Sequence, residues 1–265
     1  MRTPILFALA SAALVLAPGC SVSSLVGAHQ PLTPLLDHEG QLDVSVHGGL
    51  NSETTSTLGA QVAYAPTSGF EIAGALDADV ADGEQYPNRH FGGGVAVGWF
   101  LDHETLRLEG FVGVNGGWGE GSSDDTAPVM TGGGSAAPRP AFRLESTYVQ
   151  PFVQGMIGFE VPYFEMAGGG RLWGHLADVW GTPITGPESD GYERAFIEPM
   201  VTVRVPIDWF RIETTITFVV PIGGDYVPLP AAGWEDGYQY ALTFGFGMQL
   251  DTIEPPQEAV PSYAY

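Results

Sequence analysis

The chain has 265 residues and carries 31 acidic side chains against nine basic ones, all of them Arg, which gives a formal net charge of −22 at pH 7. That balance excludes a basic face for nucleic acid, and it argues against a peripheral protein held on anionic lipid by basic patches. With 37 Gly, 21 Pro and 44% hydrophobic residues, the composition is turn-rich and moderately apolar. Such a composition is typical of a membrane β-barrel, in which lipid-facing and lumen-facing residues alternate.

The N-terminus is typical of an export signal. Met1 and Arg2 precede an apolar stretch at 5–17, which is too short to span a bilayer as a helix. The only cysteine, Cys20, follows residues that resemble the processing site of bacterial lipoproteins, although Leu16 lies one position further from the cysteine than in the usual pattern. The resemblance predicts a signal peptide at 1–19 and a lipidated Cys20. The alternative is cleavage after Ala28, which would remove Cys20.

The rest of the chain divides into three predicted parts. Residues 20–40 lack sustained periodicity and contain two prolines, so we expect a periplasmic tether. Residues 251–265 form an acidic, proline-containing stretch that we expect to be a disordered C-terminal tail. The region 41–250 has period-two alternation, which predicts β-strands. Its ten predicted strands lie near 41–50, 58–65, 70–80, 91–101, 105–118, 147–161, 163–176, 195–205, 209–220 and 238–250.

The alternation separates an apolar face from a polar one in every predicted strand. In the last strand, residues such as Leu242, Phe244 and Phe246 share one face, while Thr243 and Gly245 share the other. Over all ten strands this phasing places no charged residue on the apolar face. It places thirteen on the other: Asp43, Glu71, Asp77, Asp79, Arg107, Glu109, Glu160, Glu165, Arg171, Glu198, Arg204, Arg211 and Glu213.

The predicted connections alternate in length. Short links fall near 66–69, 102–104, 162 and 206–208, and longer ones at 51–57, 81–90, 119–146, 177–194 and 221–237. Outer-membrane barrels join their strands by short periplasmic turns and long external loops. This topology therefore predicts that both termini are periplasmic.

The phasing and the connections together resemble bacterial outer-membrane β-barrel proteins as a class, over about residues 41–250. The resemblance implies an all-β, antiparallel, up-and-down transmembrane barrel of about ten strands in the outer membrane, with membrane lipid as its surroundings. The alternative is a soluble, lipid-anchored periplasmic β-sandwich or calycin-like ligand-binding protein, which would bury its apolar faces in a core.

Charged residues on the inner face gather near the short-turn end. Inside a barrel of this size such charges must be paired or hydrated. We interpret them as a structural network that plugs the barrel, with a cation-preferring constriction as the alternative because carboxylates outnumber Arg. The predicted interior charge network consists of Glu71, Arg107, Glu109, Glu160, Glu165, Arg204, Arg211 and Glu213.

A second inward set lies toward the loop end and contains His47, Asp77, Asp79 and His175. It resembles the rim of ten-stranded outer-membrane proteases, where acidic residues and His meet, but the spacing does not match a motif. We therefore predict no catalytic residue, and keep a rim hydrolase only as a third alternative. The sequence also has no motif for a cofactor.

The long loops are acidic. Asp124 and Asp125 are weak candidates for holding a divalent cation, which could also bridge to lipopolysaccharide. Protein partners are not indicated. The sequence as a whole favours a non-enzymatic outer-membrane barrel, either structural and surface-binding or a narrow channel for small solutes.

Overall fold

The computed structural model describes eleven stretches of the chain, namely 31–51, 56–80, 89–103, 105–123, 128–130, 136–138, 142–161, 163–182, 192–207, 210–224 and 239–251. Ten long strands make up most of these residues, and a short hairpin, β6 and β7, lies between β5 and β8. In the part of the chain described, no helix is long and apolar enough to cross a membrane. The strands are β1 (Gln41–Asn51), β2 (Ser56–Thr67), β3 (Phe70–Val80), β4 (Arg89–His103), β5 (Leu106–Ser123), β6 (Pro128–Met130), β7 (Ala136–Pro138), β8 (Phe142–Val161), β9 (Phe164–Thr182), β10 (Tyr192–Ile207), β11 (Phe210–Gly224) and β12 (Gln239–Asp251).

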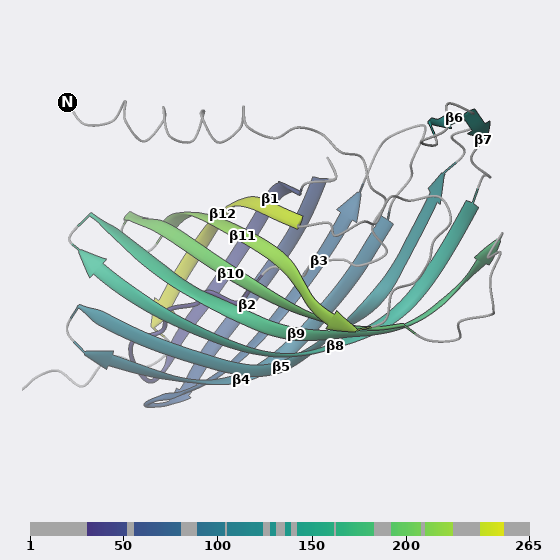
Figure 1. Ribbon diagram of the computed structural model, residues 1–265. Coiled ribbons are helices and arrows are strands. Elements are labelled where there is room, and N and C mark those ends of the chain that lie inside the picture. The colour runs from purple at the N-terminus through teal and green to yellow at the C-terminus, as the bar shows by residue number, and fades with distance from the viewer. Residues whose placement is uncertain are drawn as a thin grey trace, which may run out of the picture.

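The ten long strands form one closed antiparallel barrel in the order β1-β12-β11-β10-β9-β8-β5-β4-β3-β2. Figure 1 shows them wrapping around a common axis at a steep tilt, with the β6–β7 hairpin beyond one end. The ring closes between β1 and β12, which pair continuously from Gln41 with Asp251 to Asn51 with Ala241. This closure confirms the predicted up-and-down barrel and excludes the two-sheet sandwich, which would leave unpaired edge strands.

Connection lengths follow the predicted alternation. Two residues join β2 to β3, β4 to β5, β8 to β9 and β10 to β11, whereas the connections at the other end span 52–55, 81–88, 124–141, 183–191 and 225–238. Strand β1 begins at the short-turn end, and β12 ends there, with Gln41 paired to Asp251. Several strands extend further than predicted at the loop end, and β9 continues from the predicted 176 to Thr182.

The predicted facing of side chains is confirmed. On β1, Val46 on the outside is 51% exposed, whereas Asp43 on the inside is 2% exposed. Of the thirteen charged residues predicted to face inward, eleven are buried. Glu160 at the short-turn end is only partly covered, and the side chain of Asp79 lies outside the described residues.

The outer surface is a belt of exposed apolar side chains, including Ile72, Val95, Val153, Leu172 and Phe246. Among the side chains that the structure describes, charged residues lie on this face only toward the loop end, where the strands project beyond the belt: Arg89, Glu120, Glu145, Asp178 and Glu193. An apolar face of ten strands turned away from the core is stable only against lipid, because exposing so large an apolar surface to water is unfavourable.

Aromatic side chains lie at both margins of the belt. Trp99 and Phe164 are exposed close to the short turns, and Phe91 is exposed toward the loops. Such positions match the two aromatic girdles of membrane barrels.

Glycines on the inner face make room for large side chains from neighbouring strands. A Cβ at Gly98 would lie 2.6 Å from a ring carbon of Phe111, and one at Gly113 would lie 2.5 Å from the ring of Phe152. On β12, Gly247 makes the same room for the guanidinium of Arg211. The lumen is therefore filled by long side chains that lean over glycines on the adjacent strand.

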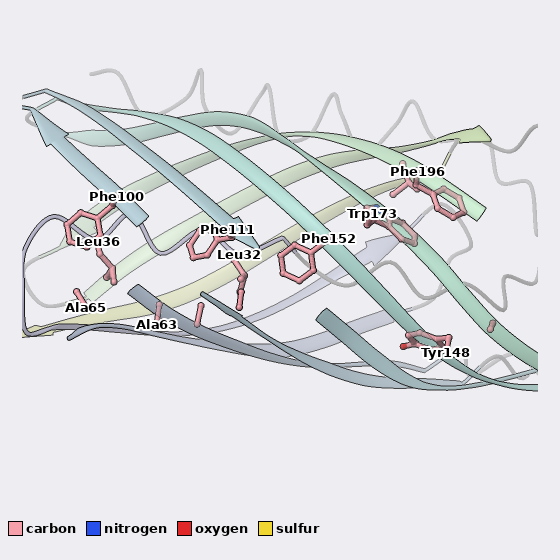
Figure 2. Packing of buried hydrophobic residues seen from close by; sticks show 14 residues of the cluster. Leu32, Leu36, Ala63, Ala65, Phe100, Phe111, Tyr148, Phe152, Trp173 and Phe196 are labelled. Carbon is pink, nitrogen blue, oxygen red and sulfur yellow. The ribbon is translucent and has the colours of Figure 1, made fainter. Parts of the chain in front are cut away.

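The structure differs from the sequence prediction at residues 31–36, which belong to the stretch 20–40 that was expected to form a periplasmic tether. Leu32, Thr33, Leu35 and Leu36 are all at most 5% exposed. Figure 2 shows Leu32 and Leu36 inside the ring of strands, in the same cluster as Phe100, Phe111 and Phe152. We call residues 31–36 the plug segment.

Candidate functional site in the barrel lumen

The plug segment is held through its backbone by side chains from five strands. Gln61 of β2 donates to the carbonyl oxygen of Pro31 across 2.8 Å. Gln154 of β8 accepts from the amide of Leu32 across 3.3 Å, and its own Nε2 donates to the carbonyl of Leu32. Nearer the short turns, Arg204 of β10 donates to the Pro34 carbonyl across 2.9 Å.

Three further bonds complete this set. Arg107 of β5 donates to the Leu35 carbonyl across 3.1 Å, and the Leu36 amide donates to Glu109 Oε1 across 2.7 Å. Gln249 of β12 reaches the Pro34 carbonyl at 3.5 Å. Buried backbone N–H and C=O groups need hydrogen-bond partners. Inside the barrel these side chains provide the partners that water or a neighbouring strand would provide elsewhere.

Two consecutive leucines of the plug segment pack in different clusters. Leu36 belongs to the cluster with Phe100 and Phe111, whereas Leu35 packs in the one formed by Met156, Ala167 and Met200. Leu35 has a φ of 53°, the left-handed region that non-glycine residues seldom adopt. This turn of the backbone sends the two side chains in different directions, and its steric cost is offset by burying both.

Arg107 binds the end of the plug segment at the mouth of the barrel. Its Nη2 donates to Asp37 Oδ2 across 3.0 Å and to Glu160 Oε2 across 2.5 Å, and its Nε donates to Asp102 across 3.4 Å. Its Nη1 lies 3.8 Å from Glu165. One guanidinium thus connects Leu35 of the plug segment and the adjoining Asp37 to the short-turn ends of β4, β8 and β9.

Arg211 and Arg204 form a second group of ion pairs, deeper and almost fully buried. Arg211 binds both carboxylate oxygens of Asp43, with Nη2 to Oδ1 at 2.8 Å, and its Nε donates to Glu213 across 3.2 Å. Arg204 Nε lies 3.2 Å from the same Glu213 oxygen, and its Nη1 lies 3.8 Å from Glu165. Glu213 is therefore shared by two guanidinium groups.

Glu71 has a different environment. It is fully buried, and neither of its carboxylate oxygens has a hydrogen-bond partner among the described residues. The structure therefore brings seven of the eight predicted network residues into contact with one another or with the plug segment, and Glu71 is the exception. Arg171 and Glu198, not assigned to the network, form a separate buried pair with Nη2 to Oε2 at 2.5 Å.

Three residues of the predicted rim set, His47, Asp77 and His175, are buried on the inner face of the barrel. His175 accepts a hydrogen bond from Gln150 across 2.9 Å and stacks on Tyr148 with ring centroids 5.1 Å apart. His90 also stacks on Tyr148, with ring centroids 5.4 Å apart, and shares a hydrogen bond with the Tyr148 hydroxyl. Asp77 lies 3.9 Å from Nδ1 of His90.

His90 and Tyr148 were not predicted, although the inward parity of their strands pointed to them. They connect Asp77 on β3 to His175 on β9 along consecutive strands of the wall, because Gly117 on the intervening strand β5 leaves room for Tyr148. His47 is buried over Gly59 of β2. A carboxylate, an imidazole and a phenol in sequence could move a proton, but stacking at this burial also fits a structural role.

Some predicted sites lie outside the described residues: Cys20, the side chain of Asp79, Asp124 and Asp125. Within the described stretches, no group of three or more His, Cys, Asp or Glu side chains is placed to hold a metal ion.

Comparisons with known proteins show the fold. No protein-family model matches the chain, and no curated protein matches it. Among solved structures, the translocator domain of the autotransporter NalP from Neisseria meningitidis is similar, with a TM-score of 0.50 and 12% identity over 80% of this chain and 90% of that one. The chain therefore has the fold of a bacterial outer-membrane β-barrel.

Other similar structures include a protease and a porin. The outer membrane protease OmpT from Escherichia coli has a TM-score of 0.47 and 11% identity over 80% of this chain and 94% of that one. The NanC porin has a TM-score of 0.41 and 9% identity over 78% of this chain and all of that one. The fold alone does not choose among their functions.

Proposed function

We propose that this chain is a non-enzymatic outer-membrane barrel that is closed at rest and serves as a structural or surface-binding protein through its long connections. The observation that carries the proposal is the plug segment, whose backbone is bonded from five strands inside the lumen. Ten strands leave little space beyond what side chains fill. With a peptide segment added, no continuous aqueous path is expected.

The proposal places the short-turn end in the periplasm, since outer-membrane barrels carry their short turns there. It retains export by residues 1–19 and lipidation of Cys20. The intact mass of the mature protein tests both: a diacylated or triacylated N-terminal cysteine supports them, and a chain starting at 29 contradicts lipidation.

Single-channel recording in planar bilayers tests the closed state. The purified wild-type protein is expected to insert without conductance steps. Insertion is checked in parallel by the faster migration of the unboiled protein on an SDS gel. Reproducible steps from inserted wild-type protein would contradict the closed state.

A narrow cation channel is the second candidate. Five buried carboxylates lie near the short turns, Asp43, Glu71, Glu109, Glu165 and Glu213, against three guanidinium groups, Arg107, Arg204 and Arg211. This excess of negative charge favours cations in any path through the lumen. Cation-selective steps from the wild-type protein would support this candidate.

A rim hydrolase is the third candidate, favoured by the Asp77, His90 and Tyr148 contacts. It predicts that Asp77→Ala or His175→Ala abolishes a hydrolytic activity and leaves heat-modifiable migration unchanged. Without such an activity in the wild-type protein, this candidate fails.

A further inference from the structure

The lumen recognises the plug segment mainly as a polypeptide backbone. Seven hydrogen bonds from lumen side chains reach its carbonyl oxygens and amides, at Pro31, Leu32, Pro34, Leu35 and Leu36. Bonds of this kind do not depend on the side chains of the bound segment. Another peptide whose backbone follows the same path, including the turn at Leu35, makes the same bonds.

Two features restrict the peptide. At both prolines, which have no N–H, the lumen offers donors to the carbonyl: Gln61 at Pro31, and Arg204 with Gln249 at Pro34. Apolar surfaces receive the leucines, with Phe100 and Phe111 in the cluster of Leu32 and Leu36. The preferred pattern is therefore Pro-Leu-x-Pro-Leu-Leu or a close apolar relative.

The plug segment is not part of the barrel wall. Residues 31–36 form no strand and take no part in the ladders that close the ring. After the plug segment, the backbone joins the wall at Gly40, whose amide donates to the Ala65 carbonyl across 2.7 Å, and then at β1. The segment can therefore leave without breaking an inter-strand hydrogen bond.

We propose that the short-turn half of the lumen is a binding site for proline-containing apolar peptides, which residues 31–36 of the chain itself occupy in cis. This inference goes beyond the proposed closed state and does not require it. A covalently tethered occupant has an effective concentration in the millimolar range, so a free peptide competes only when the plug segment is weakened.

The test uses the full-length protein in detergent with the double substitution Leu32→Asp/Leu36→Asp. These changes place two carboxylates in the apolar cluster that Leu32 and Leu36 share, and so release the plug segment. The probe is a fluorescently labelled synthetic peptide with the sequence of residues 29–38, followed by anisotropy. Saturable binding to the variant, at least about tenfold tighter than to wild type, is expected.

Two buried glutamines of β8 provide a matched pair. In the released variant, Gln154→Ala removes two hydrogen bonds to the peptide backbone and is expected to weaken binding about tenfold. Gln150→Ala removes a bond to His175 and is expected to leave peptide affinity unchanged. A peptide with Asp at the positions of Leu32 and Leu36 serves as the non-binding ligand.

If the double variant does not fold, a full-length chain in which residues 31–36 are replaced by Gly and Ser takes its place. A released variant with intact heat-modifiable migration that binds no peptide would overturn the proposal, and so would binding that Gln154→Ala and Gln150→Ala change equally. Conductance tests the closed state separately, so the two proposals can fail independently.

Discussion

Arg204 on β10 donates a hydrogen bond from Nη1 to the carbonyl oxygen of Pro34, 170 positions earlier in the chain, across 2.9 Å. The same guanidinium lies 3.2 Å from Glu213 on β11 and 3.8 Å from Glu165 on β9. Arg204 thus joins the plug segment to three neighbouring strands, and it is only 1% exposed.

Arg204→Met is expected to lower the free energy of unfolding by about 3–5 kcal/mol, because it leaves buried carboxylates without their partner. The measurement is urea unfolding in detergent followed by tryptophan fluorescence. Arg89→Met is the matched control, since Arg89 is exposed on the outer face, and it is expected to change stability by no more than about 0.5 kcal/mol. Equal losses for both variants would show that the buried network does not stabilise the barrel.

The bidentate pair between Arg211 and Asp43 predicts strong energetic coupling. Each single change, Asp43→Asn or Arg211→Met, leaves the other group buried with a lost partner. The double variant is expected to cost about 2 kcal/mol less than the sum of the two single variants. Unfolding free energies of the four proteins give this coupling directly.

A second cycle controls for general effects of losing charge. Asp43→Asn combined with Arg171→Met should be additive within about 0.5 kcal/mol, because Arg171 is paired with Glu198 instead. Coupling of similar size in both cycles would mean that the lumen responds to net charge and not to specific pairs.

The strands and their facing could be predicted from the sequence because lipid imposes a strict rule on them. A side chain such as Val153 or Phe246 must be apolar where it faces hydrocarbon, and its neighbours along the strand are free to be polar. The period of two then fixes which residues point inward, and closure follows from the need to pair every strand edge.

The plug segment could not be predicted in the same way. Residues 31–36 have no period, and their burial depends on partners such as Gln154 and Arg204, far away in the sequence. The contact of His90 with Tyr148 escaped prediction for a related reason. It crosses the intervening strand β5 and is possible only because Gly117 has no side chain.

Gly98→Ala tests whether inner-face glycines are needed for packing. The added Cβ would lie 2.6 Å from Phe111 and 2.8 Å from the carbonyl oxygen of Gly110, so either the ring or the strand must move. The expected loss is about 1–3 kcal/mol of unfolding free energy. Gly155→Ala on the outer face is the control, because nothing lies within 4 Å of its added Cβ. Its stability is expected to match wild type, and a similar loss at both positions would point to backbone effects in place of a clash.

The apolar outer belt predicts that a charge is tolerated near its margin and not at its centre. Val153 is 48% exposed at the middle of β8, between Val112 and Leu172 on the neighbouring strands. Val153→Arg is expected to make folding into phospholipid vesicles less favourable by about 2–4 kcal/mol. Thr147→Arg, on the same face of β8 but opposite Asp178 where charges begin, is expected to cost about 1 kcal/mol or less. Reversible folding into vesicles, titrated with urea, measures both. An equal loss at the two sites would mean that the apolar belt does not end where Asp178 and its charged neighbours lie. The strands would then sit deeper in the membrane than their surface pattern indicates.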